Sequence, residues 1–193
     1  LITLWGITIA LALSLLLYFF HWGNQSANRC LSLILCVSSV LAMLGVFKNE
    51  QVFDLSLLYA IFSMQLMIGP MLYFYTRLMT QANFRWNIQQ LWHLFPMVAS
   101  CLIWQIQSTQ LSHEGLESFN CYWVSKDCSI LYQGRFIHRL MAIISAIVYL
   151  IACLSILRNH QQSIKNSYSA IEEVNLNWLA ILIYTMLAFT VWG

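Results

Sequence analysis

Residues 140–157 read LMAIISAIVYLIACLSIL, eighteen positions without one Asp, Glu, Lys or Arg. Two further charge-free stretches are longer still, residues 1–20 (LITLWGITIALALSLLLYFF) and residues 55–75 (LSLLYAIFSMQLMIGPMLYFY). A helix rises about 1.5 Å per residue, so each stretch is long enough to cross roughly 30 Å of bilayer hydrocarbon. The sequence therefore predicts an all-α, polytopic transmembrane helix bundle.

The composition of the whole chain favours the same class. Hydrophobic residues make up 60% of the 193 residues and charged residues 8%, against roughly 25% charged in an ordinary soluble domain. With two prolines and seven glycines, no linker or low-complexity tract divides the chain, which indicates one domain over residues 1–193. The net charge of +2 is too small to indicate nucleic-acid binding by this chain itself.

Six apolar segments are expected to span the membrane, and helix is the expected conformation because lipid cannot satisfy free backbone groups. They cover residues 1–20, 30–47, 55–75, 91–107, 137–157 and 176–193. The fourth segment is the least apolar. The alternative to a full span there is a re-entrant or interfacial segment. Residue 1 is Leu and the last segment is still hydrophobic where the sequence stops, so we expect the full protein to extend beyond both ends, and the family resemblance described below implies a seventh span.

The basic residues of the connections predict the orientation. Lys and Arg are enriched in cytoplasmic loops. The first, third and fifth connections carry five of them and two acidic residues, against four basic and five acidic residues in the other two. This predicts a multi-pass protein of the bacterial inner membrane with its N-terminus outside. The five basic residues are Arg29, Arg77, Arg85, Arg158 and Lys165.

The long fourth connection, residues 108–136, then lies outside the cytoplasm, where disulfides persist. It contains Cys121 and Cys128, which predict a disulfide, with two free thiols as the alternative. Tyr122 and Trp123 lie between them and are the candidates for receiving a signal.

Small and polar side chains inside the spans have two interpretations. Gly6, Ala10 and Ser14 recur every four residues, a stripe that favours close helix packing. Ser63, Gln65 and Gln105 lie near the middle of spans, where they either line a small ligand pocket or, as we favour, form hydrogen bonds between helices.

Neither a metal nor an enzyme is expected. His93 is expected at the cytoplasmic end of the fourth span and His138 at the outer end of the fifth, so most of the membrane thickness separates them. No Cys or carboxylate stands beside them at ligand spacing. Charged residues at the centre of spans, which usually mark ion or proton pathways, are missing as well. We therefore expect no catalytic residue, no metal and no cofactor.

Three short stretches, taken together, resemble a known family. They are Gly69–Arg77 (GPMLYFYTR), His93–Pro96 (HLFP) and Asn175–Leu179 (NLNWL). In this order and spacing they resemble the N-terminal membrane domain of bacterial membrane-anchored AraC-family transcriptional regulators. Asn177 departs from the pattern, which places a basic residue before the tryptophan.

The resemblance implies a multi-span membrane domain followed by a cytoplasmic DNA-binding domain with two helix-turn-helix units. The expected function is a sensor and anchor that passes an envelope or lipid-soluble signal to that domain. Its partners would be the bilayer, a small ligand or periplasmic signal, DNA through the C-terminal domain, and a second copy in a homodimer. A small-molecule transporter or channel is the alternative. The residues expected to couple signal to output are Pro70, Tyr73, Tyr75, Arg77, His93, Pro96, Asn175, Asn177 and Trp178.

Overall fold

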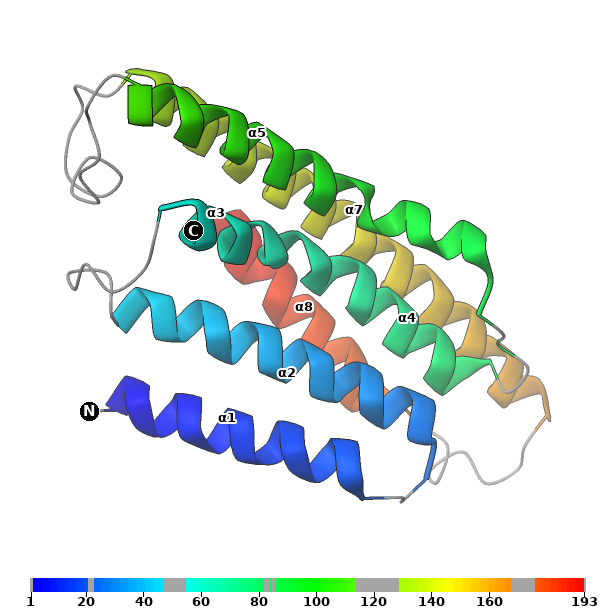
Figure 1. Cartoon of the computed structure of the whole chain (residues 1–193). Coiled ribbons are helices and arrows are strands. Elements are labelled where there is room, and N and C mark those ends of the chain that lie inside the picture. The colour runs from blue at the N-terminus through cyan, green and yellow to red at the C-terminus, as the bar shows by residue number, and fades with distance from the viewer. Residues whose placement is uncertain are drawn as a thin grey trace.

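A computed structural model describes residues 2–20, 23–46, 55–81, 84, 86–113, 129–167 and 176–192. Every regular element in these ranges is a helix (Figure 1), so the all-α prediction is confirmed for them. In chain order they are α1 (Ile2–Phe19), α2 (Gln25–Val46), α3 (Leu55–Ser63), the 3₁₀-helix η1 (Met64–Met67), α4 (Ile68–Thr80), the 3₁₀-helix η2 (Ile88–Leu94), α5 (Phe95–His113), α7 (Ser129–Ser167) and α8 (Asn177–Trp192).

The helices run up and down beside one another. α4 is central and packs between α2 and α7, α5 lies along α3 and α7, and α1 lies along α2 at the edge of the bundle (Figure 1). The last turns of α4 therefore lie at the same end as the start of η2 and the start of α8, on the right of Figure 1. We call this end, marked by the close of α4 at Arg77–Thr80, the Arg77 end.

Two of the described helical segments are long and apolar enough to cross a membrane, α2 (Gln25–Val46) and the Phe136–Ile164 part of α7. α1 and α8 contribute shorter apolar segments, Thr3–Phe19 and Asn177–Met186. A buried core helix of a soluble protein can have the same length and composition. Here, however, only 28% of the apolar window of α2 and 17% of that of α7 are buried. The structure thus supports membrane association through two helices, fewer than the six spans that the sequence predicts.

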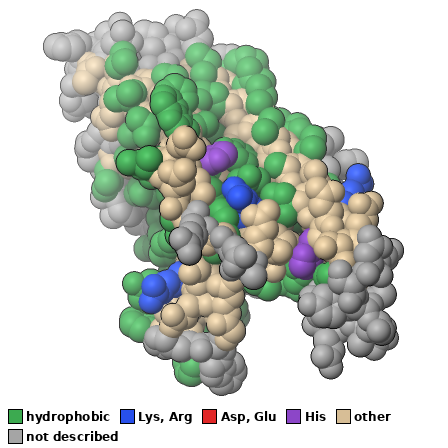
Figure 2. Space-filling model, turned by 90° about the vertical axis from the view of Figure 1, so that its right-hand side faces the viewer, with side chains coloured by type: hydrophobic (Ala, Val, Ile, Leu, Met, Phe, Trp, Pro, Cys, Tyr) green, Lys and Arg blue, Asp and Glu red, His purple; other side chains and the backbone are tan. Residues whose placement is uncertain are grey.

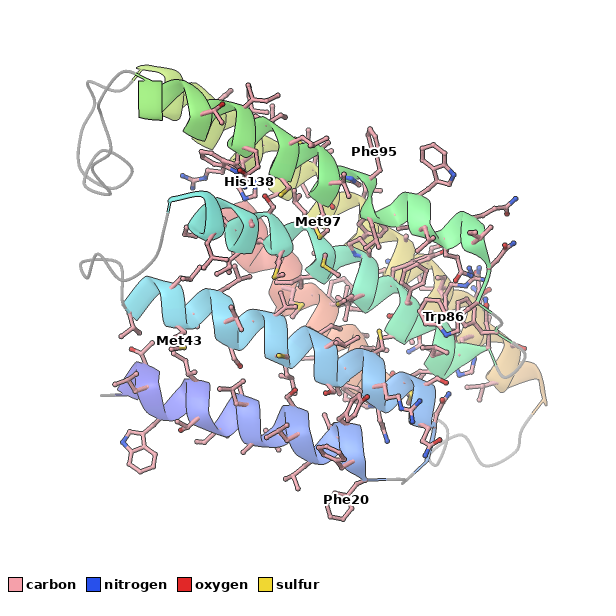
Figure 3. All side chains as sticks on the ribbon, viewed as in Figure 1. Phe20, Met43, Trp86, Phe95, Met97 and His138 are labelled. Atoms are coloured by element: carbon pink, nitrogen blue, oxygen red, sulfur yellow. The ribbon has the colours of Figure 1, made fainter. Side chains whose placement is uncertain are left out.

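Large apolar side chains cover the outside of the bundle. Phe95, Val98, Leu102 and Ile106 form an exposed stripe on α5 at helical spacing, and Figure 3 shows Phe20 and Phe95 pointing away from the neighbouring helices. α7 carries a similar exposed stripe through Leu140, Ile144, Val148 and Ile151. A water-soluble monomer rarely exposes contiguous apolar surface on this scale.

Hydroxyl groups, in contrast, are buried between the helices. Ser14 on α1 and Ser32 on α2 donate to each other's backbone carbonyls, over 2.9 Å from Ser14 and 2.7 Å from Ser32. Ser14 of the predicted stripe therefore lies in the helix contact, whereas Gly6 has no atom within 4 Å of an added Cβ and lies outside it. The other buried hydroxyl residues among those described are Ser39, Ser63, Thr76 and Ser100.

Two helices extend beyond the predicted second and fifth spans. α2 begins at Gln25 rather than residue 30, because the Asn24 side chain accepts a hydrogen bond from the backbone of Ala27 over 3.3 Å and caps the helix. α7 has 39 residues rather than the predicted 137–157, since its polar flanking turns continue the helix. At about 1.5 Å per residue it is roughly 58 Å long, nearly twice the thickness of bilayer hydrocarbon.

The third and fourth spans are each divided by a 3₁₀ segment. Predicted span 55–75 consists of α3, η1 and α4, which ends at Thr80. Pro70 cannot donate to the carbonyl of Leu66, and η1 lies directly before the turn that contains it. The fourth segment begins at Ile88 as η2 and becomes an α-helix at Phe95, where Pro96 is tolerated because first-turn amides have no partner within the helix. The segment predicted as the sixth span, 176–193, contains α8.

Candidate ligand pocket at the Arg77 end

Three consecutive aromatic residues at the end of α4 contact three different parts of the bundle. Because a helix turns 100° per residue, Tyr73, Phe74 and Tyr75 point in different directions. Tyr73 meets His93 with ring centroids 5.5 Å apart, and Phe74 meets the same ring at 5.2 Å. Tyr75 meets Trp178 of α8 at 6.4 Å. The Gly69–Arg77 stretch therefore contacts each of the other two stretches that carry the resemblance.

His93 is held by a residue that the sequence did not single out for this role. Its Nδ1 atom lies 2.8 Å from the hydroxyl oxygen of Tyr149 on α7, at hydrogen-bonding distance. The Tyr149 ring also lies against Gly69, where an added Cβ would come within 3.0 Å of Tyr149 Cδ2. Tyr149 therefore joins α4, α7 and η2 at one point.

Arg77 lies on aromatic faces. Its guanidinium carbon is 4.6 Å from the ring centroid of Phe84 and 5.8 Å from that of Tyr73, and its Nε donates to the Gln81 side chain over 3.1 Å. A guanidinium in this position is stabilised by the electron-rich ring faces. Figure 2, which looks onto this end, shows basic and histidine side chains among the apolar ones.

Asn177 at the start of α8 is held by a hydrogen bond to α7. Asn177 accepts a hydrogen bond from the side-chain amide of Gln161 on α7 over 3.0 Å. A lysine or arginine side chain carries only donors and could not accept this bond. Asn177 therefore fixes the start of α8 against α7, beside the Tyr75–Trp178 contact.

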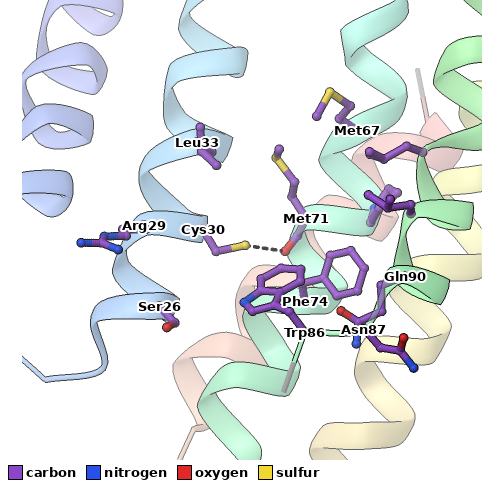
Figure 4. A pocket seen from close by; sticks show the side chains of 13 residues that line it. Ser26, Arg29, Cys30, Leu33, Met67, Met71, Phe74, Trp86, Asn87 and Gln90 are labelled. Carbon is purple, nitrogen blue, oxygen red and sulfur yellow. Dashed lines mark hydrogen bonds between the residues drawn. The ribbon is translucent and has the colours of Figure 1, made fainter. Parts of the chain in front are cut away.

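A pocket of about 360 Å³ lies between α2, α4 and η2 at this end (Figure 4). Cys30 closes one wall, where its Sγ donates to the carbonyl of Met71 over 3.2 Å, and Pro70 and Phe74 form the wall on α4. The volume is within the range of about 300–1,000 Å³ that is typical of ligand sites. The lining residues are Ser26, Arg29, Cys30, Leu33, Met67, Pro70, Met71, Phe74, Trp86, Asn87, Gln90, Leu91 and Leu94.

A second, more open groove of about 490 Å³ runs along the outer side of α7. Tyr73, His93, Pro96 and Tyr149 line it, together with exposed residues of the α7 stripe. Pro70 thus lines the pocket and Tyr73, His93 and Pro96 line the groove, so these predicted coupling residues are grouped around the two hollows.

A buried polar chain crosses the other half of the bundle. Ser63 and Ser100 hydroxyl oxygens are 3.4 Å apart, and Ser100 Oγ is 2.7 Å from Nδ1 of His138. Trp104 packs on the imidazole with centroids 6.0 Å apart. A serine beside an imidazole is the arrangement of a base-activated nucleophile, but Ser100 is 1% exposed. We interpret the chain as a hydrogen-bonded contact between α3, α5 and α7, as expected for Ser63.

The two histidines lie at different levels. His138 is eleven positions from Tyr149 along α7, about 16 Å, and Tyr149 is the residue that holds His93. Within the described ranges, no group of three His, Cys, Asp or Glu side chains lies close enough to hold a metal ion.

Five of the predicted site residues lie outside the described ranges: Cys121, Tyr122, Trp123, Cys128 and Asn175. Conversely, Cys30, Trp86 and Tyr149 emerge from the structure as site residues. The aromatic residues between 84 and 95 are a signal that could have indicated Trp86. Cys30 and Tyr149 lie in uniformly apolar spans, where no local pattern distinguishes them.

No protein-family model, curated protein or solved structure matches this chain. The class is therefore defined by the fold and the site themselves: a helical bundle with an apolar exterior, buried hydroxyl groups and a pocket at the end where its aromatic residues gather.

Proposed function

We propose that this chain is the membrane-embedded sensor and anchor domain of a transcriptional regulator, with a cytoplasmic DNA-binding domain as its output. One observation carries the proposal. At the Arg77 end, the end of α4 contacts two stretches that are far from it in the sequence, at His93 through Tyr73 and at Trp178 through Tyr75. Under the proposed orientation this end faces the cytoplasm, where an output domain would dock.

The distribution of side chains supports insertion in a bilayer. Apolar stripes such as Leu102–Ile106 on α5 face outward, and serines such as Ser32 and Ser100 face inward. In lipid an apolar exterior is solvated and an unpartnered hydroxyl is not, so hydroxyl groups turn toward other helices. We propose on this basis that the remaining apolar helices also cross the inner membrane, giving six spans with the N-terminus outside.

The proposed coupling runs through α4. Its Pro70 and Phe74 line the pocket, whereas Tyr75, one position further, contacts α8 through Trp178. A ligand that binds one position of α4 more tightly than another shifts the equilibrium between the two by that difference in affinity. The start of α8 would then move with the end of α4.

Replacing Trp178 by alanine in the full-length protein tests this route. The lost aromatic contact is worth about 0.5–1.5 kcal/mol, so we expect a roughly 2- to 10-fold change in output from a target-promoter reporter. Trp5→Ala is the control, because Trp5 is 69% exposed on α1, at the edge of the bundle. Unchanged output of Trp178→Ala at normal abundance in the membrane would remove this contact from the mechanism.

The reading frame beyond codon 193 separates the two candidate functions. A further span followed by a helix-turn-helix domain is expected for the regulator. A stop codon soon after Gly193, together with solute flux in liposomes, would favour the transporter or channel instead.

Labelling of a variant that keeps only Cys121 tests the orientation. We expect a membrane-impermeant maleimide to label this thiol in intact spheroplasts, because the proposed topology puts residues 108–136 outside the cytoplasm. A variant with its single cysteine at Gln81, which follows α4 at the Arg77 end, should react only after permeabilisation. The reverse pattern would overturn the orientation and with it the signalling direction.

A further inference from the structure

We propose that the pocket between α2, α4 and η2 binds a neutral amphiphile, a molecule with an uncharged hydrogen-bonding head and an aliphatic chain. The signalling role of such a ligand rests on the proposed function, in which the bound ligand would be the signal. The binding itself is argued from the charge, polarity and position of the described residues that line the pocket.

The charge of the described lining favours an uncharged ligand. Arg29 is the only charged residue among the described lining residues. Its guanidinium carbon lies 5.9 Å from the ring centroid of Tyr18 on α1, and Figure 4 shows the group pointing toward α1 and away from the hollow. With Arg29 in this position, a carboxylate or ammonium head inside the pocket would lose its hydration without a counter-charge beside it, which is costly.

The polarity of the lining changes along the pocket. Ser26 and Asn87 lie at its lower edge in Figure 4, whereas Leu33 and Met67 lie at its upper edge. Ser26 and Asn87 are next to the starts of α2 and η2, at the Arg77 end. A ligand with a hydroxyl or carbonyl head there and a chain along the apolar wall would match both regions.

The walls suit a flexible aliphatic chain. Met67 and Met71 can adapt their shape to it, because methionine is unbranched and has several rotatable bonds. Phe74 and Trp86, with ring centroids 5.1 Å apart, both line the pocket. Because the lining comes from α2, η1, α4 and η2, an occupant would hold these elements in one relative position.

Three probes with the same chain and different heads test the charge selectivity. Full-length protein in lipid nanodiscs is incubated with tritiated 1-decanol, and unlabelled 1-decanol, decanoate and decyltrimethylammonium compete at pH 8. We expect 1-decanol to compete at concentrations at least tenfold lower than either ion. Equal competition by all three would indicate unspecific apolar partitioning and overturn the proposal.

Substitutions locate the bound probe. Leu33 lines the pocket but is half-exposed, so Leu33→Trp fills the hollow without disturbing the core. We expect at least tenfold weaker binding of 1-decanol. Leu102→Trp on the outer face of α5 is the matched control and should bind as the unmodified protein does. Equal binding by both variants would place the probe elsewhere.

The alkylation of Cys30 tests the site in the unmodified protein, without any substitution. Cys30 lines the pocket, so bound 1-decanol should slow its alkylation by N-ethylmaleimide, measured by peptide mass spectrometry. Cys101 on α5 is half-buried and does not line this pocket, so it should react at the same rate with and without the probe. Unaltered alkylation of Cys30 at a saturating concentration of 1-decanol would overturn the site.

The binding proposal and the proposed function can each be overturned without the other. Selective binding without any change in the reporter would leave the site intact and overturn its role in sensing. A reporter that responds to Trp178→Ala in a protein that does not bind 1-decanol selectively would leave the sensor intact and overturn this ligand class.

Discussion

Replacing Trp104 by alanine is expected to lower the free energy of unfolding by about 3–5 kcal/mol, as large-to-small substitutions of buried aromatic residues do. Trp104 is 1% exposed and is the largest of the fully buried side chains described. Its ring packs on His138 of α7, so truncation opens a cavity between α5 and α7. In a bilayer the transfer of the ring out of water contributes little, and lost packing accounts for the effect.

The matched control for this prediction is Trp5→Ala. Trp5 is the same residue type, 69% exposed on α1, and surrounding lipid can fill the volume that its ring leaves. We expect a change within about 0.5 kcal/mol. Reversible unfolding in mixed micelles, followed by circular dichroism, measures both variants. Equal destabilisation would show that the α5–α7 packing described here is wrong.

Replacing Gly69 by leucine is the second large effect expected, a loss of about 1–3 kcal/mol from overpacking. The first added carbon would already lie 3.0 Å from Cδ2 of Tyr149. The ring cannot easily retreat, because its hydroxyl is hydrogen-bonded to His93 over 2.8 Å. The substitution should therefore separate α4 from α7 and break the Tyr149–His93 bond as well.

Gly45→Leu is the control for the second prediction. Gly45 is also helical, in the last turns of α2, and an added Cβ there meets no atom within 4 Å. We expect its stability to stay the same or rise slightly, since leucine favours helix more than glycine by close to 1 kcal/mol. If Gly69→Leu unfolds at the same denaturant concentration as Gly45→Leu, α4 and α7 are not in close contact at this point.

Parts of the site were predictable because prolines and short motifs mark them in the sequence. Pro70 and Pro96 mark local breaks, and both fall beside 3₁₀ segments. Tyr73 and His93 belong to two of the stretches that carry the resemblance, and their rings are in contact, as are those of Tyr75 and Trp178. The division between pocket and groove was not predictable, because it depends on the directions in which Tyr73 and Phe74 leave α4.

The sequence alone determined that the chain is helical and apolar along most of its length, since uninterrupted charge-free stretches admit little else. It did not indicate which face of each helix is turned inward. A helix that is hydrophobic all round carries no amphipathic pattern from which its inward face can be read. That choice depends on packing between segments distant in sequence, as in the pairing of Ser14 with Ser32 and of Gly69 with Tyr149, and it exists only in the assembled bundle.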